Sequence, residues 1–376
     1  MTTSSNQSWQ PVIASSLVMS LALLGDALLY AVLPLHAAAF GISLAWVGIL
    51  LSANRIVRVF AYGAIARLGH HFGQRRACIA AAVGAIVSTG MYGLVSGEVW
   101  LLAARVLWGL SYAALLLATL AYAVTDRGAV GARVGWSRAI QRAGPIAALI
   151  GGAWLTASVG PRDIFVWLAV LTILAVPFAW SLPRKTVVDE GPQSTRSLAR
   201  PSRVDLIFLL QGAGVDGVFA ISITLLLAES MSLEAALALG GTMLALRHIG
   251  EAVASPIFGT IADRFGARPV FALSLGMTTL GFVGVAMDYT IAGAIVLLIF
   301  RGALAVLGPA VIVQSADESA PVMGDLANMQ AWRDLGAAIG PVVTGFALAV
   351  VSAQWLHGCT ALLLLLLMFA WMSVRR

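Results

Sequence analysis

The sequence predicts an all-α membrane protein in which twelve transmembrane helices form two pseudo-symmetric six-helix bundles. The first observation is composition: 60% of the 376 residues are hydrophobic and only 11% are charged, whereas soluble domains carry about 25% charged residues. Mean hydropathy is +0.92. The other two observations are a series of apolar runs and a repeat of the first half in the second. The composition excludes a soluble enzyme, a disordered chain and a nucleic-acid-binding module.

A helix that crosses a bilayer needs about 20 mostly apolar residues. Runs of this kind predict spans at residues 11–36, 43–66, 77–96, 99–124, 134–158, 162–182, 204–228, 233–260, 268–287, 290–314, 326–352 and 355–374. A polar stretch rich in proline, serine and charge separates the sixth span from the seventh and predicts a linker. The predicted domains are an N-terminal bundle at 1–182, a cytoplasmic linker at 183–203 and a C-terminal bundle at 204–376.

Basic residues fall almost entirely on one side of the predicted spans. The loops and tail on the side of the N-terminus hold Arg67, Arg75, Arg76, Arg127, Arg133, Arg184, Lys185, Arg196, Arg200, Arg203, Arg264, Arg268, Arg375 and Arg376. The opposite side holds only Arg162. Because cytoplasmic loops carry the excess of Lys and Arg, we expect both termini in the cytoplasm and a multi-pass protein of the bacterial cytoplasmic (inner) membrane. The net charge of +6 then needs no nucleic-acid partner.

The two halves repeat each other at a constant offset of 196 residues (301 minus 105). Matches at this offset join Arg105 to Arg301, Trp136 to Trp332, Gly144 to Gly340 and Pro145 to Pro341. Two six-helix units repeated in parallel topology imply an axis along the membrane normal and a binding site between the units.

Three loops and helices carry recognisable motifs. The loop after the eighth span reads GTIADRFGARP (Gly259–Pro269) and fits the pattern G-x-x-x-D-R-x-G through Asp263 and Arg264. The equivalent loop after the second span, ARLGHHFGQRR, has His70 at the position of the acidic residue. The fourth span contains LLAARVLWGLSYA, which fits L-x-x-x-R-x-x-x-G through Arg105.

In these motifs, in its twelve spans and in its repeat, the chain resembles the major facilitator superfamily. The resemblance implies a secondary transporter that works by alternating access. It also implies that the second span faces the eleventh and the fifth faces the eighth. We therefore expect gating contacts between Arg58 and Asp334, and between Arg138 or Arg142 and Glu251, with Asp263 and Arg264 in the gating loop. The fifth span carries part, and the eleventh more, of the family's glycine–proline antiporter pattern, which favours efflux.

Ionisable side chains inside the spans indicate the chemistry of the cargo. Each costs at least about 2.5 kcal/mol at membrane depth. The predicted spans hold eight arginines, Arg55, Arg58, Arg105, Arg138, Arg142, Arg247, Arg301 and Arg333, and four acids, Asp26, Asp216, Glu251 and Asp334. Eight against four leaves four positive charges that need another anion. Arg138 lies near a cytoplasmic end, where we expect its side chain to reach the lipid headgroups.

The predicted substrate-binding residues are Arg55, Arg58, Tyr30, Arg142, Gln211, Asp216 and Arg247. Arg55 and Arg58 belong to one polar stripe of the second span, together with Ser52 and Tyr62. Gln211 and Asp216 lie in the glycine-rich segment QGAGVDG, which permits close packing or bending. Arg247 and Glu251 are four residues apart on one helix, so we expect a local ion pair between them.

Asp26 is the predicted proton carrier. It is a lone carboxylate in an apolar run, where loss of hydration favours the protonated form; the alternative is a neutral acid hydrogen-bonded to a neighbouring helix. Glu251 and His248 can titrate as well, and the family resemblance gives Arg105 the role of tuning the carboxylate. His248 and Glu251 form an H-x-x-E spacing without the second histidine of a zinc motif, so neither a metal nor an enzyme activity is expected.

The leading interpretation is a proton-coupled secondary active transporter of a small organic anion or acidic zwitterion. The sequence has no G-x-x-x-x-G-K-[ST] loop and its only lysine is Lys185, so we expect no nucleotide or other cofactor. The partners would be the substrate, protons and membrane lipids, and the protein would be monomeric. One alternative is a drug/proton antiporter for amphiphilic or cationic compounds. Alternatives of another class are a non-transporting membrane sensor and an intramembrane enzyme.

Overall fold

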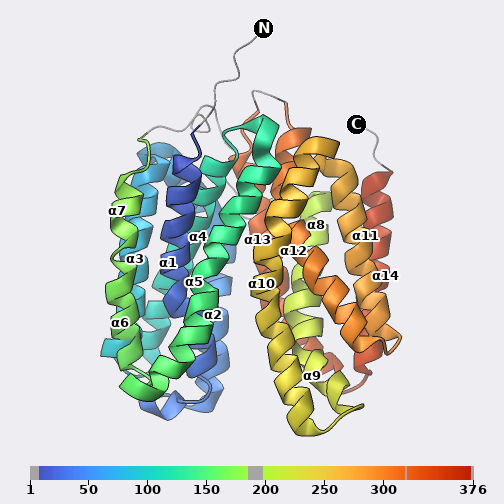
Figure 1. Cartoon of the computed structure of the whole chain (residues 1–376), viewed down its shortest axis with the longest axis horizontal. Helices are drawn as coiled ribbons and strands as arrows, with labels where there is room; N and C mark the ends of the chain where they lie inside the picture. The colour runs from blue at the N-terminus through green and yellow to red at the C-terminus, as the bar shows by residue number, and fades with distance from the viewer. Residues whose placement is uncertain (1–7, 185–197, 318–319, 374–376) are drawn as a thin grey trace.

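The structure is a computed structural model that describes residues 8–184, 198–317 and 320–373. Helices on one side of Figure 1 come from the first half of the chain. They are α1 (Gln10–Val32), α2 (Leu44–Phe72), α3 (Gln74–Leu94), α4 (Glu98–Ala123), α5 (Val130–Val159), α6 (Asp163–Thr172) and α7 (Ala175–Trp180), with short 3₁₀ turns η1 (Ala37–Phe40) and η2 (Arg127–Ala129).

The other side of Figure 1 is built from the second half of the chain. Its helices are α8 (Arg203–Gly212), η4 (Ala213–Phe219), α9 (Ala220–Ala228), α10 (Leu233–Phe265), α11 (Ala267–Ala286), α12 (Thr290–Ser315), α13 (Met323–Ala347) and α14 (Ala353–Met372). α1 begins and α14 ends at the same end of the molecule, called the terminal end below. Residues 185–197 of the predicted linker lie outside the described residues, and the domain boundaries stay a prediction.

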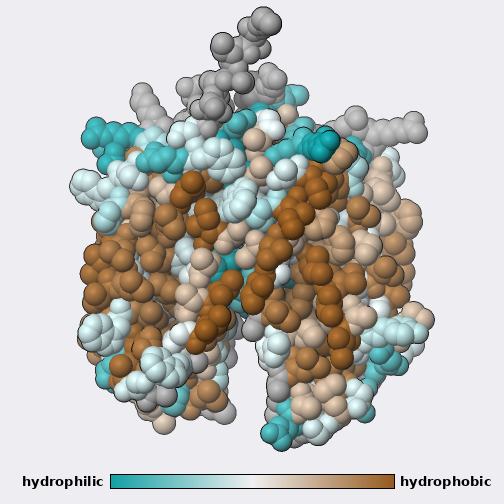
Figure 2. Space-filling model, in the orientation of Figure 1, coloured by the Kyte–Doolittle hydropathy of each residue, from teal (hydrophilic) through white to brown (hydrophobic). Residues whose placement is uncertain are grey.

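The all-α membrane fold is confirmed. Within the described residues, nine helical stretches are long and apolar enough to cross a membrane. The other three predicted spans correspond to α5, α10 and α13, which are 30, 33 and 25 residues long. These three are less apolar because they carry six of the twelve predicted intramembrane charges, two on each helix. Figure 2 shows apolar side chains over the middle of both halves and polar ones towards both ends, most densely at the terminal end.

The sixth span, predicted as one helix, is divided between α6 and α7. Pro177 has no amide hydrogen, so it cannot continue the regular hydrogen-bond ladder. The chain tightens just before it: the amides of Ile173 and Leu174 donate to the carbonyl groups of Val170 and Leu171, three residues earlier, at 3.1 Å each. The break is therefore a local consequence of the proline.

The seventh span is continuous, but its middle turn is wider than an α-helix. Residues Ala213–Phe219, within the predicted glycine-rich segment, form the π-helical turn η4 between α8 and α9. Such turns are frequent at functional sites because they displace side chains from the regular helical path. Gly217 lies directly against α13: a Cβ there would be 2.4 Å from the carbonyl carbon of Gly340. Asp216 projects from this turn.

Equivalent positions of the repeat make equivalent contacts. A Cβ on Gly144 of α5 would be 1.9 Å from the carbonyl oxygen of Ser20 on α1. A Cβ on Gly340 of α13 would be 2.7 Å from Ala213, at the middle of the first span of the other half. In both halves, the fifth span thus packs its backbone on the first span of the same half.

The halves meet at the terminal end and diverge at the other, where Figure 2 shows a cleft between them. α5 and α10 come very close there: a Cβ on Gly131 would be 2.2 Å from the carbonyl oxygen of Gly259, and a Cβ on Gly259 would be 2.1 Å from that of Gly131. No residue other than glycine fits this crossing without separating the two helices.

Gly259→Val should therefore open the terminal end. Overpacking of this kind costs about 1–3 kcal/mol, which changes the ratio of two conformations roughly 5- to 150-fold. Spin labels on Gly128 and Phe265, in a chain whose Cys78 and Cys359 are replaced by alanine, would report longer distances. Gly276→Val is the matched control, because the nearest atom to a Cβ there is the Met368 Sδ at 3.8 Å. An unchanged distance distribution in folded Gly259→Val would contradict the prediction.

Candidate functional site

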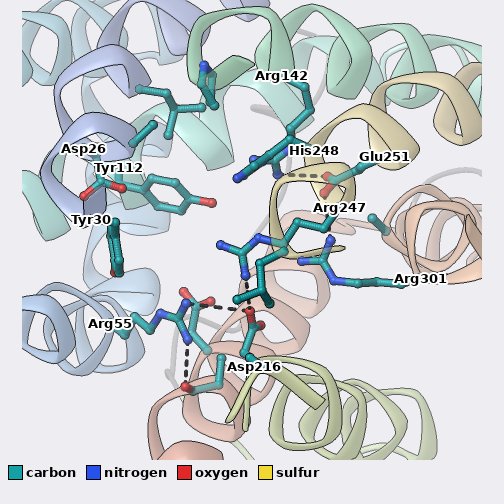
Figure 3. Close-up of a pocket in the computed structure, with 18 of the residues that line it drawn as sticks. Asp26, Tyr30, Arg55, Tyr112, Arg142, Asp216, Arg247, His248, Glu251 and Arg301 are labelled. Atoms are coloured by element: carbon teal, nitrogen blue, oxygen red, sulfur yellow. Dashed lines mark hydrogen bonds and ion pairs between the residues drawn. The ribbon is translucent and has the colours of Figure 1, made fainter. Parts of the chain in front are cut away.

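A cavity of about 570 Å³ lies between the two halves. α1, α2, α4 and α5 line it from the first half, and α8 to α10, α12 and α13 from the second. Arginine and carboxylate side chains from both halves converge in it (Figure 3). Within the described residues, no group of three or more His, Cys, Asp and Glu side chains could hold a metal ion.

Three carboxylates of the second half are each held by two arginines, one from each half. We call these groups ion triads. In the first, Oδ1 of Asp216 lies 3.7 Å from Nη2 of Arg55 on α2 and 3.4 Å from Nη1 of Arg247 on α10. Arg55 also donates from Nη1 to the carbonyl oxygen of Ala337 on α13, at 2.8 Å. Figure 3 shows Asp216 between the two guanidinium groups.

The second ion triad joins α5, α10 and α12 around Glu251. Nη2 of Arg142 donates to Oε1 at 2.9 Å, and Nη1 of Arg301 donates to Oε2 at 3.2 Å. Both carboxylate oxygens are thus occupied, and the Glu251 side chain is 3% exposed. This triad ties α5 of the first half to α10 of the second.

The third ion triad joins α2 to α13 around Asp334. Oδ2 lies 3.0 Å from Nε of Arg58 and accepts a hydrogen bond from the Tyr62 hydroxyl at 2.7 Å. Oδ1 accepts from Nη2 of Arg333 at 3.1 Å. The Arg58 guanidinium also lies 4.1 Å from the centre of the Tyr112 ring, a favourable cation–π contact. Arg58–Asp334 and Arg142–Glu251, the two predicted cross-half contacts, are therefore both present.

A fourth ion pair lies within the first half. Nη1 of Arg105 on α4 donates to Oδ1 of Asp26 on α1, and Nε donates to the carbonyl oxygen of Leu50 at 2.9 Å. Arg105 is 0% exposed. The sequence around Asp26 is apolar, but the carboxylate is paired with Arg105, the residue to which the family resemblance gave the role of tuning it.

Charge in the cavity is unbalanced. Six lining arginines, Arg55, Arg58, Arg142, Arg247, Arg301 and Arg333, face the three carboxylates of the ion triads, which leaves three positive charges. Asp26 also lines the cavity but is neutralised by Arg105. Arginine stays charged in proteins and binds carboxylate or phosphate groups in a forked geometry. The cavity is thus suited to a small anionic ligand.

Two predictions about arginines are wrong. The local pair Arg247–Glu251 does not form, because Arg247 turns to Asp216 and Glu251 is occupied by Arg142 and Arg301. Arg138 does not reach the headgroups. Its side chain is buried, and within the described residues neither Nη atom has a hydrogen-bond partner.

The burial of Arg138 follows from how α5 packs on α10. A Cβ on Gly135, one turn earlier on α5, would be 2.5 Å from the carbonyl oxygen of Ser255. The backbone of α10 therefore covers this part of α5 and closes the route to the headgroups. Of the two arginines predicted to contact Glu251, it is Arg142 that does so.

The remaining predicted residues divide between the cavity and the loop at the terminal end. Tyr30, Gln211 and His248 line the cavity. Asp263 accepts hydrogen bonds from the amides of Gly131 and Ala132 at 2.7 Å each, where a carboxylate is favoured by the positive end of the α5 dipole. Arg264 is exposed and lies over the ring of Phe265, 5.5 Å from its centre. The structure tests none of their proposed roles.

Sequence reasoning missed two residues of the site, Arg301 and Tyr112. Arg301 was recognised as an intramembrane arginine but not as a partner of Glu251, whereas neutralisation of Arg333 by Asp334 was considered as an alternative to the cross-half contact. The 196-residue match of Arg301 to Arg105 was the available signal for the first of them. Tyr112 had no comparable signal, because an aromatic residue in an apolar helix is ordinarily a packing residue.

Two repeated bundles of membrane-crossing helices around a charged central cavity define a multi-pass membrane transporter. The family model of the Major Facilitator Superfamily matches residues 15–214 and 206–376, and the chain belongs to this family. No curated protein sequence matches the chain.

Solved structures agree on the fold. The human organic anion transporter MFSD10 (TETRAN) superposes with a TM-score of 0.76 at 15% identity, covering 96% of this chain and 98% of that one. The Escherichia coli fucose:proton symporter FucP superposes with a TM-score of 0.75 at 12% identity, covering 97% of this chain and 99% of that one. The proton:xylose symporter XylE superposes with a TM-score of 0.69 at 13% identity, covering 97% of this chain and 94% of that one.

Proposed function

We propose that the protein moves a small organic anion or acidic zwitterion across the bacterial cytoplasmic membrane by alternating access, coupled to protons. The observation that carries the proposal is the excess of three arginines over carboxylates in the ion triads. Each triad carboxylate is shared by two arginines, so one positive charge per triad is not neutralised. Because an excess charge at membrane depth is unfavourable, an anionic ligand stabilises the cavity. One solved neighbour is described as an organic anion transporter and two as proton symporters, which supports the same class.

Alternating access would use the contacts between the halves. With both termini in the cytoplasm, the terminal end is the cytoplasmic side, and Arg58–Asp334, Arg142–Glu251 and the Asp263 contact with α5 hold it closed. Opening this side separates each first-half arginine from its carboxylate, while the same-half arginines Arg301 and Arg333 stay with their acids. Gating by these residues, with Arg138 and Arg264 beside them, is part of the proposal.

The proton would bind to a titratable group of the cavity, and the candidates are Asp26, Asp216, Glu251 and His248. Only the glycine–proline pattern of α5 and α13 bears on direction, and it favours efflux. The carboxylates of the ion triads are already bound by arginine, so a cationic drug would find no free acid among them. This favours the anion over the cationic substrate of a drug/proton antiporter.

A binding comparison tests the proposal. Benzoate, succinate and phenyl phosphate should raise the melting temperature of the purified protein, whereas tetraphenylphosphonium should not. A ligand at 100 times its Kd stabilises by about 2.7 kcal/mol. Uptake of the stabilising anion into proteoliposomes separates a transporter from a sensor. Stabilisation by tetraphenylphosphonium alone would overturn the proposal in favour of the drug antiporter.

Arg55→Gln should weaken binding of the stabilising anion. A hydrogen bond to a charged group contributes about 1.5–3 kcal/mol, which corresponds to a Kd roughly 10- to 150-fold higher. Arg76→Gln is the matched control, because Arg76 is exposed at the start of α3. If Arg55→Gln and wild type bind the stabilising anion with equal Kd, Arg55 does not contact the anion.

A further inference from the structure

The three ion triads differ in how firmly they hold their carboxylates. Asp334 is 2% exposed and Glu251 3% exposed, with arginine contacts of 2.9 to 3.2 Å. Asp216 is 16% exposed, and its two contacts are 3.4 and 3.7 Å long. Arg55 and Arg247 are themselves 20% and 27% exposed. Asp216 is thus the triad carboxylate that a ligand in the cavity can most readily displace.

The two oxygens of Asp216 are not equivalent. Both arginine contacts fall on Oδ1, and within the described residues Oδ2 has no protein donor. Arg301 of α12 and Arg333 of α13 lie within electrostatic range. α8 contributes Gln211 to the cavity and α14 places Thr360 against the π turn. The charged groups that act most strongly on Asp216 are thus cationic and favour its ionised form while the cavity is empty. Oδ2 is the oxygen at which a proton can bind once a ligand has taken the arginines.

We infer that the anionic group of the substrate takes the place of Asp216 between Arg55 and Arg247, and that Asp216 takes up a proton as it does so. The inference rests on the proposed function. Once the substrate's anionic group occupies both guanidinium groups, the displaced Asp216 has lost its two ion-pair partners and lies beside a like charge, and both changes disfavour its ionised form. When Asp216 becomes neutral, the incoming anion restores the charge that the carboxylate supplied, so the buried charge of the triad is unchanged.

This exchange couples the proton to the substrate without a separate proton pathway. One anion and one proton enter together and leave together, which makes the coupling a symport and favours uptake in an inward proton gradient. The direction then differs from the efflux favoured by the glycine–proline pattern. Because one proton is taken up on binding, the Kd for the anion should rise about tenfold per pH unit where Asp216 is otherwise ionised.

Isothermal titration of benzoate, succinate and phenyl phosphate into the purified protein tests this, in Tris and in Bis-Tris at the same pH. The two buffers are cationic and differ in ionisation enthalpy, so the difference in heat gives the number of protons taken up. Wild type and Asp163→Asn, an exposed control on α6, should take up about one proton per anion. Asp216→Asn should bind the anion with no proton uptake and with a Kd independent of pH.

The outcomes separate the two proposals. Proton uptake that persists in Asp216→Asn, or that is lost in Asp26→Asn instead, would overturn the inference and leave anion transport standing. No binding of any of the three anions to wild type would overturn the proposed function and the inference with it. Asp216→Ser serves as a second neutral variant if Asp216→Asn does not fold; its Arg55 and Arg247 are exposed enough for water to replace the carboxylate.

Discussion

Replacing Arg58 by aspartate should abolish transport and open the terminal end of the protein. Asp334 is 2% exposed and the Arg58 side chain 7% exposed, so the change places two buried carboxylates opposite each other. Removing one partner of a buried ion pair already costs about 3–5 kcal/mol. About 5.5 kcal/mol is enough to reverse a 99:1 ratio of two states. The closed terminal end, which depends on this contact between α2 and α13, should therefore become a minor state.

The charge swap distinguishes a cross-half gate from local neutralisation. If Asp334 served only to neutralise Arg333, which it also contacts at 3.1 Å, the swap would restore nothing. If Arg58–Asp334 is the gate, adding Asp334→Arg to Arg58→Asp should recover part of the transport rate. The spin-label distance between Gly128 of η2 and Phe265 of α10 should shorten again in the double variant. If the double variant transports no faster than the slower of the two single variants, Arg58–Asp334 is not a gate.

The sequence was sufficient to predict where charges lie along the chain but not which of them pair. Arg247 and Glu251 are neighbours on one helix face, which is why a local pair was expected. Their actual partners come from the π turn, α5 and α12, and no periodicity within one helix encodes these. The burial of Arg138 has the same origin, since the crossing of α5 and α10 at Gly135 is a tertiary contact.

One feature of the ion triads was nonetheless visible in the repeat. At the offset of 196 residues, Arg55 matches Glu251 and Arg138 matches Asp334, so equivalent positions of the two halves carry opposite charges. The first half thus contributes three arginines and no carboxylate to the ion triads, whereas the second half contributes all three carboxylates and the other three arginines. Two identical halves would present like charges across the cavity, whereas these halves attract each other when it closes.

Asp26→Asn should destabilise the protein by about 3–5 kcal/mol, because it leaves Arg105 charged and unpaired at 0% exposure. Melting of the purified protein measures the loss. Adding Arg105→Met should recover most of it, because an apolar replacement of a buried pair is often neutral or stabilising. Loss of the Arg105 hydrogen bond to Leu50 limits the recovery.

The size of this loss decides whether Asp26 carries the proton. A carboxylate that is protonated once in every transport cycle must be tolerated in its neutral form, so its asparagine variant should fold with nearly wild-type stability. Asp216→Asn should behave in this way, since water reaches Arg55 and Arg247. Asp26→Asn should be less stable than wild type, because Arg105 is buried and water cannot replace its lost carboxylate partner. A stable Asp26→Asn beside an unstable Asp216→Asn would reverse the two roles, making Asp26 the proton carrier and Asp216 a structural partner of its arginines.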